Sequence, residues 1–303
     1  MNLLLTGAFS CTQKMREELA ALGHRIFCLQ QEKDPLPCRY DEIEGVVCNG
    51  LFLHHPIEKF TSLRFIQLTS AGLDRVDADY IAAHDIALFC ARGVYSIPMA
   101  EFALCGVLQI YKQSRYFLEN QKKHLWEKHR GLSELCGKTV CIVGCGSVGC
   151  ETARRFSAFG TRVIGVDLYP REDALFEKIY PLETLGEVLS ESDVVILTLP
   201  LTKETQKLFD ASLFACMKSG ACLVNIARGG IVDGDALVDA LQNQKLGGAV
   251  LDVFESEPLA EDSPLWDMEN VIVTPHNSFV GQGNVLRLFD LVKNNLIAYQ
   301  KEA

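Results

Sequence analysis

Short apolar runs and helical patterns alternate regularly along the second half of the chain. From about residue 138 onward, continuous apolar runs recur, and most are separated by segments whose apolar residues follow helical spacing. Continuous apolar strands that alternate with amphipathic helices are typical of a parallel sheet covered on both faces. The predicted strands are TVCIV (139–143), RVIGV (162–166), VVILTL (194–199), ACLVNI (221–226), GGAVLDV (247–253) and VIVT (271–274).

The first ninety residues repeat this pattern less regularly and predict a second α/β domain, also with a parallel sheet. Its helix CTQKMREELAALG closes at Gly23, and its strands are NLLLTG, RIFCL, GVVCN, RFIQLTS and IALFC. A long, largely apolar helix is predicted from Ser96, with Pro98 in its first turn, where a missing N–H is harmless. The amphipathic segment 283–300 is predicted to return to the first domain. We therefore place one domain at 1–94 and 277–303 and the other at 95–276.

Composition narrows the possible partners and compartment. The 303 residues carry a net charge of −10, with 48% hydrophobic and 22% charged residues, which is ordinary for a soluble globular protein. The negative charge argues against nucleic acid or an anionic membrane as the main partner. The chain shows neither an 18-residue apolar run nor the basic start of a signal peptide. The twelve cysteines match no metal-ligand spacing, so we expect reduced thiols, no metal and a cytoplasmic protein.

A glycine-rich turn follows the first strand of the larger domain. GCGSVG (144–149) fits the pattern Gly-x-Gly-x-x-Gly and opens a helix whose N-terminus can hold a pyrophosphate. Asp167 ends the next strand, 18 residues after Gly149, where a carboxylate would bind a ribose diol. A glycine turn with only a structural role and an Asp that only caps a turn would not be expected together at this spacing. We predict a Rossmann dinucleotide site formed by Gly144, Gly146, Ser147, Val148, Gly149 and Asp167.

The same carboxylate indicates which dinucleotide binds. A 2′-phosphate beside Asp167 would face a like charge, and the next residues are Leu168 and Tyr169 rather than an arginine. Arg171 is the only nearby cation and has a simple alternative explanation as a surface residue. NAD is therefore favoured over NADP.

Polar side chains follow three successive strands of the larger domain. Arg228 comes after the fourth strand, Asp252 and Glu257 after the fifth, and His276 after the sixth. Ligands in such sheets bind beyond the carboxyl ends of the strands. Each residue alone could be a solvated loop side chain, but three groups at successive strand ends predict an active site.

These motifs resemble those of the D-isomer-specific 2-hydroxyacid dehydrogenases. The resemblance rests on GCGSVG, NIARGGIVD, LDVFESEP and TPH, with SAGLDRVD and GVYSIPMAE upstream, and it covers nearly the whole chain. It implies a Rossmann NAD domain, a flavodoxin-like α/β substrate domain closed by the C-terminal helix, and a homodimer built through the NAD domain.

The resemblance also implies a role for each site residue. His276 would be the general acid/base, Glu257 its carboxylate partner, and Arg228 the group that holds the substrate carboxylate and polarises its carbonyl. This chemistry suits the residue types, because an imidazolium can protonate an alkoxide and a nearby carboxylate stabilises the imidazolium. The cofactor would be bordered by Leu199 and Pro200, its carboxamide oriented by Asp252 and the backbone at Ala227, and the substrate carboxylate bound by N–H groups of Ser70, Ala71 and Gly72.

The substrate is predicted from departures from the family pattern. His276 is followed by Ser278 and Phe279, where the family more often has small residues. Asn49 and Leu68 stand where phosphoglycerate dehydrogenases tend to carry arginines. A small unphosphorylated 2-keto acid such as hydroxypyruvate or glyoxylate is therefore expected. Phosphoglycerate remains the alternative substrate, and a non-catalytic NAD sensor resembling the corepressors of this fold remains the alternative function.

Overall fold

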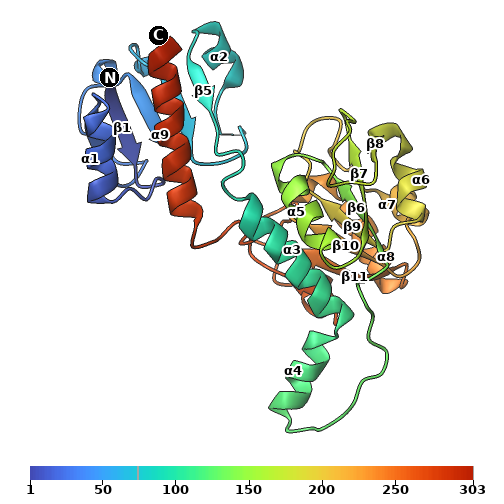
Figure 1. The fold of residues 1–303 in the computed structure, drawn as a ribbon. Helices are drawn as coiled ribbons and strands as arrows, with labels where there is room; N and C mark the ends of the chain where they lie inside the picture. Colours follow the sequence, from blue (N-terminus) through green and yellow to red (C-terminus); the bar gives the residue numbers. More distant parts are fainter. Residues whose placement is uncertain (74, 303) are drawn as a thin grey trace. The chain divides into compact units, whose positions relative to one another are not determined.

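The chain divides into two compact units (Figure 1). The computed structural model describes residues 1–73 and 75–302. Unit 1 comprises residues 1–95 and 281–303, and unit 2 comprises residues 96–280. Each unit is built on its own parallel sheet, so the α/β class predicted for both halves of the chain is confirmed.

The sheet of unit 1 has the strand order of the flavodoxin-like fold. Its described residues form five parallel strands in the order β2-β1-β3-β4-β5. The strands are β1 (Asn2–Thr6), β2 (Arg25–Leu29), β3 (Gly45–Cys48), β4 (Phe65–Leu68) and β5 (Ala87–Phe89), and the helices are α1 (Gln13–Ala21), α2 (Ala78–Ala83) and α9 (Asn284–Glu302). The predicted second α/β domain is thereby confirmed.

The C-terminal helix α9 belongs to this unit because its apolar stripe packs on the sheet. Leu288, Phe289, Val292 and Leu296 lie in one buried cluster with strand and α1 residues. Asn295 in α9 also donates a hydrogen bond to the buried Gln67 of β4 at 2.7 Å. Helix α9 therefore lies with the sheet of unit 1.

Unit 2 contains a doubly wound sheet. Residues 96–280, all of which the structure describes, form seven parallel strands in the order β12-β11-β10-β9-β6-β7-β8. This is the Rossmann order, extended by one strand. The strands are β6 (Thr139–Val143), β7 (Arg162–Asp167), β8 (Ile179–Pro181), β9 (Val194–Leu197), β10 (Ala221–Asn225), β11 (Leu246–Leu251) and β12 (Val271–Val273). The sequence pattern missed β8, because three residues that include a proline give no recognisable apolar run.

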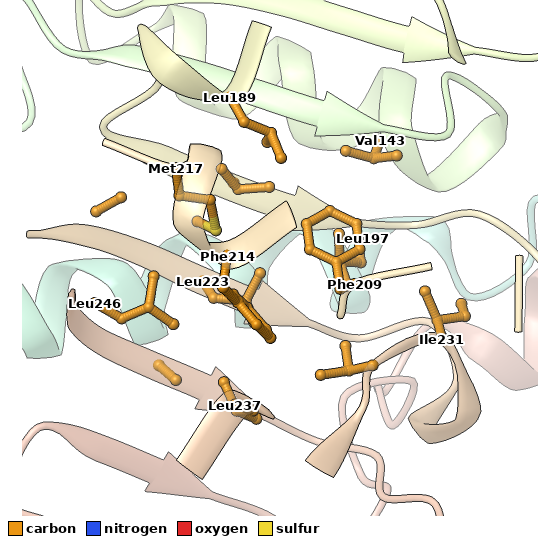
Figure 2. Close-up of a cluster of buried hydrophobic side chains, with 14 of the residues drawn as sticks. Val143, Leu189, Leu197, Phe209, Phe214, Met217, Leu223, Ile231, Leu237 and Leu246 are labelled. Atoms are coloured by element: carbon orange, nitrogen blue, oxygen red, sulfur yellow. The ribbon is translucent and has the colours of Figure 1, made fainter. Parts of the chain in front are cut away.

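Helices cover both faces of this sheet, as the continuous apolar strands predict. Figure 2 shows one face, where Leu189, Phe214 and Leu237 of the covering helices lie in the same buried cluster as Val143 and Leu197 of the strands. Alternate strand residues point to the other face, where they pack against α3 and α5. The helices of unit 2 are α3 (Ser96–Tyr111), α4 (Ser114–Lys122), α5 (Ser147–Ser157), α6 (Leu185–Ser190), α7 (Ala211–Cys216) and α8 (Gly234–Gln242).

The long, largely apolar helix predicted from Ser96, with Pro98 in its first turn, is confirmed as α3, and a second helix follows it. Helix α3 ends at Tyr111, and α4 begins at Ser114. The break lies at Gln113, whose φ of 50° is in the left-handed region that a continuous right-handed helix does not contain. No described helix has the length and apolar character needed to cross a membrane.

Candidate active site

The glycine loop lies where two neighbouring strands of unit 2 end. Gly144 follows β6 with a φ of +98°, and a Cβ there would lie 2.6 Å from the backbone N of Leu199, just past β9. A Cβ on Gly149 would lie 2.2 Å from the Gly144 carbonyl oxygen. The folded chain itself therefore requires glycine at these two positions. Strands β6 and β9 are adjacent, so this loop occupies the point where the strand order reverses.

Gly146 differs from these two glycines. A Cβ placed on it would meet no protein atom within 4 Å. Packing therefore does not explain this glycine, whereas a ligand approaching the backbone would. Ser147 and Val148 begin α5 directly after it, so the positive N-terminal end of this helix lies next to the open position. The residues present fit the pyrophosphate of a dinucleotide.

Asp167 connects the end of β7 to the glycine loop. Its Oδ2 accepts a hydrogen bond from the Cys145 N–H at 2.7 Å, and its Oδ1 accepts one from the Tyr169 N–H at 3.0 Å. Each carboxylate oxygen can accept a further hydrogen bond. The side chain is therefore held beside the loop with capacity to bind a ribose diol.

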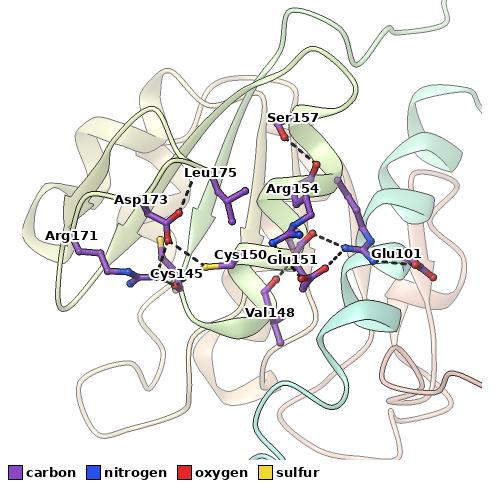
Figure 3. A network of polar contacts seen from close by, with 12 residues as sticks. Glu101, Cys145, Val148, Cys150, Glu151, Arg154, Ser157, Arg171, Asp173 and Leu175 are labelled. Carbon is purple, nitrogen blue, oxygen red and sulfur yellow. Dashed lines mark hydrogen bonds and ion pairs between the residues drawn. The ribbon is translucent and has the colours of Figure 1, made fainter. Parts of the chain in front are cut away.

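Arg171 also contacts this loop, so it is more than an isolated surface residue. Its guanidinium donates to the Cys145 carbonyl at 2.7 Å and forms an ion pair with Asp173 at 3.4 Å (Figure 3). Burial raises the pKa values of the nearby Cys145 and Cys150 thiols, which keeps both uncharged. This end of the glycine loop therefore faces the carboxylate of Asp167 and the guanidinium of Arg171, whose charge is partly neutralised by Asp173.

Thr205, which the sequence analysis did not single out, holds the segment after β9 in place through hydrogen bonds. Leu199 packs against Gly144, and the Pro200 carbonyl accepts a hydrogen bond from the Thr205 hydroxyl at 2.7 Å. The same hydroxyl accepts one from the Thr202 N–H at 2.7 Å, and Thr205 is 1% exposed. A threonine in a polar loop gives no sequence signal for such a role.

Arg228 lies in a tight loop after β10. Asn225, the last residue of the strand, accepts from the Ala227 N–H and donates to the Arg228 carbonyl, both at 3.1 Å. The Arg228 guanidinium donates to the Ala227 carbonyl at 2.7 Å. Asn225 thus shapes the loop that carries Arg228. Its position at the strand end, three residues before the arginine, is the sequence feature that could have predicted this role.

The Arg228 loop lies directly against the segment that carries Glu257. A Cβ on Gly229 would lie 1.8 Å from the Phe254 carbonyl carbon, so the two backbones are in close contact. The Phe254 N–H in turn donates to Glu257 Oε1 at 3.1 Å. Strands β10 and β11 are adjacent, which brings both segments to the same edge of the sheet.

His276 and Glu257 form a hydrogen-bonded pair at this edge. His276 Nδ1 lies 2.9 Å from Glu257 Oε2, and the two side chains are 42% and 39% exposed. His276 follows β12, which pairs with β11, so the adjacent strand ends bring the two residues together. The pairing leaves Nε2 as the ring nitrogen that does not face Glu257.

Asp252 is hydrogen-bonded to the segment that carries His276. It directly follows β11, is completely buried, and contacts this segment through Thr274, Asn277 and Ser278. The structure therefore brings Asp252, Glu257 and His276 together on two neighbouring strand ends, as their positions after successive strands suggested.

The predicted substrate-carboxylate loop belongs to unit 1. Ser70, Ala71 and Gly72 follow β4, and the Ser70 hydroxyl donates to the Gly72 carbonyl at 3.0 Å. The Ser70 carbonyl accepts from the Ala91 N–H at 2.8 Å, which ties the loop to the segment after β5. Asp74 of the same SAGLDRVD motif lies outside the described residues.

Comparison with known proteins shows that this chain is similar to 2-hydroxyacid dehydrogenases and related reductases. Residues 104–278 match the family model of the NAD binding domain of D-isomer specific 2-hydroxyacid dehydrogenases. An (S)-sulfolactate dehydrogenase of Chromohalobacter salexigens is 36% identical over 222 residues, 73% of this chain and 72% of the relative. A glyoxylate reductase of Korarchaeum cryptofilum is 35% identical over 251 residues, 80% of this chain and 75% of the relative.

A solved structure is similar to this chain over nearly its whole length. It is a D-isomer specific 2-hydroxyacid dehydrogenase family protein from Aeromonas salmonicida, with a TM-score of 0.83 and 33% identity. The alignment covers 99% of this chain and 95% of that one. The likeness therefore includes both sheets.

Proposed function

Since this chain belongs to the D-isomer-specific 2-hydroxyacid dehydrogenase family and matches the model of its NAD binding domain, we propose that it is an NAD-dependent enzyme that interconverts a small unphosphorylated 2-keto acid and the D-2-hydroxy acid. Hydroxypyruvate and glyoxylate are the favoured keto acids. The observation that carries the proposal is the 2.9 Å hydrogen bond between His276 Nδ1 and Glu257 Oε2 at the carboxyl edge of the sheet. A proton donor oriented by a carboxylate is what carbonyl reduction requires.

His276 would exchange the proton. NAD, when bound, supplies the hydride chemistry. Because Nδ1 faces Glu257, we assign proton transfer to Nε2 of the same ring. The imidazolium would protonate the oxygen of the reduced carbonyl, and the neutral ring would accept that proton in the oxidative direction. Glu257 would stabilise the protonated ring and fix its orientation.

Arg228 would hold the substrate. Its planar, permanently charged guanidinium suits a carboxylate and an adjacent carbonyl. The backbone contact between Gly229 and Phe254 supports this role, because it fixes the Arg228 loop against the loop that carries Glu257. In unit 1, backbone N–H groups at Ser70, Ala71 and Gly72 would bind the substrate carboxylate. We accordingly assign substrate binding to residues 1–94 with 277–303 and NAD binding to residues 95–276.

The cofactor would be held by the residues that border the open position at Gly146. Leu199, Pro200 and the backbone at Ala227 would line its nicotinamide half, with Asp252 nearby, and Asp167 would bind the ribose diol. Two features support NAD over NADP: Asp167 repels a 2′-phosphate, and the guanidinium of Arg171 is paired with Asp173. Repulsion of a 2′-phosphate by Asp167 therefore outweighs its attraction to Arg171.

Unit 1 supports an unphosphorylated substrate. Asn49 and Leu68 follow or end strands where phosphoglycerate dehydrogenases tend to carry arginines. Leu68 is completely buried. The carboxylate of Glu32 accepts hydrogen bonds from the Asn49 and Gly50 N–H groups, each at 2.7 Å. A carboxylate at this edge would repel a phosphate, so phosphoglycerate is the weaker alternative.

A screen of NADH oxidation across 2-keto acids tests the proposal. We expect turnover with glyoxylate or hydroxypyruvate and a lower kcat/KM with phosphohydroxypyruvate. A higher kcat/KM with the phosphorylated substrate would favour phosphoglycerate dehydrogenase. Tight NADH binding with negligible oxidation by every keto acid would instead favour a non-catalytic NAD sensor.

We also propose that the protein is a homodimer formed through unit 2. Helix α4 and the chain after it extend away from the sheet of that unit (Figure 1). They expose Phe117, Leu118, Leu125 and Trp126, and Trp126 is 98% exposed. An exposed apolar group of this kind is typical of a protein–protein contact. Light scattering should give twice the chain mass, and replacing Leu118 and Trp126 by serine should give a monomer.

A cytoplasmic location is the remaining part of the proposal. All twelve cysteines lie in the described part of the chain, and all have free thiols. Reduced thiols suit a compartment that keeps cysteines reduced. Fractionation with an antibody against the protein should find it with cytosolic markers; recovery with membranes would contradict this assignment.

A further inference from the structure

Asp252 is buried, and its carboxylate accepts hydrogen bonds from one short segment, residues 274–278. It is 0% exposed. Its Oδ1 accepts hydrogen bonds from the Thr274 hydroxyl at 2.6 Å and the Asn277 N–H at 2.7 Å, and its Oδ2 accepts one from the Ser278 N–H at 2.8 Å. Its backbone carbonyl accepts another from the His276 N–H at 2.8 Å. One residue therefore bonds to the chain before, at and after His276.

The backbone of His276 needs such support. Its φ of 49° lies in the left-handed region, which a residue with a Cβ adopts at an energetic cost. A strained residue persists only where its surroundings hold it, and the bonds to Asp252 flank it on both sides. The conformation that directs the imidazole is therefore maintained from beneath by a buried carboxylate.

Packing contributes less to holding the ring. The His276 side chain is 42% exposed, and its hydrogen-bond partner Glu257 is 39% exposed. Phe279 contacts the imidazole edge-on with 6.1 Å between ring centroids, and it is itself 39% exposed. Because these neighbours are partly solvated, the turn below the ring has the greater influence on where the ring lies.

We propose that Asp252 is a positioning residue that fixes the left-handed turn and thereby holds His276 against Glu257. The inference rests on the proposed function, since it matters for the reaction only if His276 is the acid/base. It differs from the expectation that Asp252 orients the nicotinamide carboxamide. The three donors to its carboxylate all come from residues 274–278 rather than from a cofactor-facing segment.

A double-mutant cycle tests this role. Asp252→Asn replaces one acceptor oxygen by an NH₂ group that faces a donor, so the turn should relax. We expect kcat to fall ~10- to 100-fold, the scale for a misplaced catalytic group, with the NADH dissociation constant within about twofold of wild type. In a His276→Ala background the same substitution should change kcat by less than about twofold, because the group it positions is absent.

Two outcomes would overturn the proposal. Equal losses of kcat in both backgrounds would mean that Asp252 acts independently of His276. A rise in the NADH dissociation constant that matches the loss of rate would mean that it acts on the cofactor. Failure of the proposed function is a separate result: His276→Ala alone would then leave the rate unchanged.

A milder variant and a control complete the test. Thr274→Val removes one donor with little change in shape and should lower kcat by roughly 3- to 10-fold, again only when His276 is present. If Asp252→Asn does not fold, this variant decides the question by the same comparison. Asp193→Asn is the control, because Asp193 accepts from the Thr139 N–H at 3.0 Å at the opposite edge of the sheet. It should reduce stability without changing kcat in either background.

Discussion

Gly229→Ala should separate the loop that carries Arg228 from the loop that carries Glu257. The new Cβ would lie 1.8 Å from the Phe254 carbonyl carbon, 2.1 Å from its oxygen and 2.4 Å from the Glu255 nitrogen. Favourable carbon contacts lie at about 3.5–4.0 Å, so the overlap exceeds ~1 Å. All three atoms belong to the backbone, and no side-chain rotation can relieve the contact.

The magnitude follows from this displacement. A shift of about 1 Å in a catalytic group costs on the order of 10²-fold in rate, so kcat/KM for the keto acid should fall by ~10²-fold. Overpacking of this kind typically costs ~1–3 kcal/mol of stability. The Tm should therefore fall by several degrees. The NADH dissociation constant should change little, because the glycine loop is formed by other residues.

The assay compares Gly229→Ala with a matched glycine five residues further on. Gly234 is the first residue of α8, and a Cβ there would meet nothing within 4 Å. Gly234→Ala should keep wild-type kcat/KM and an equal or higher Tm, since alanine favours a helix. If Gly229→Ala instead retains kcat/KM within about threefold and an unchanged Tm, the contact between the two loops does not position the site.

Four further experiments test the remaining assignments. Glu257→Gln removes the carboxylate that orients the His276 ring, so kcat should fall by ~10- to 10²-fold in both reaction directions, and wild-type rates would contradict the pairing. Arg228→Lys keeps the positive charge but loses the planar guanidinium that can donate two parallel hydrogen bonds, so kcat/KM should fall ~10²-fold. A kcat/KM within about threefold of wild type would show that Arg228 does not hold the substrate. NADH should exceed NADPH in kcat/KM by at least ~10-fold because of Asp167, and equal use of both would refute this. Burial lowers the pKa of His24, so the unfolded state binds the proton more readily than the folded state. The free energy of unfolding should therefore decline as pH falls below about 6.5. In urea titrations His24→Leu should reduce this pH dependence, whereas an unchanged dependence would show that another group is responsible.

Much of the fold follows from patterns that the sequence carries locally. A strand buried on both faces must be apolar throughout, so the runs at 139–143 and 162–166 identify strands without any knowledge of their neighbours. The glycine spacing and the strand-end position of Asp167 predict a dinucleotide site in the same way. Strand β8 escaped prediction because a three-residue edge strand is too short to show a period.

The placing of the site residues also follows in part from topology. Parallel strands end at one edge, so residues after consecutive strands of such a sheet meet there once the strands are adjacent. This reasoning predicts that Glu257 and His276 lie at one edge, and the structure adds the 2.9 Å contact between them. Neither a hydrogen bond nor its partner atoms can be derived from strand order alone.

The sequence by itself determined the fold class, the NAD-type glycine loop and the polar residues that follow successive strands, because each depends on the burial or chemistry of nearby residues. The folded chain alone decided the helix break at Gln113, the left-handed turn at His276, its support by the buried Asp252 and the close approach of Gly229 to Phe254. These features depend on contacts between segments brought together by folding or on backbone angles that no residue type dictates. A local pattern reports which residues are buried, whereas the tertiary structure decides which atoms meet.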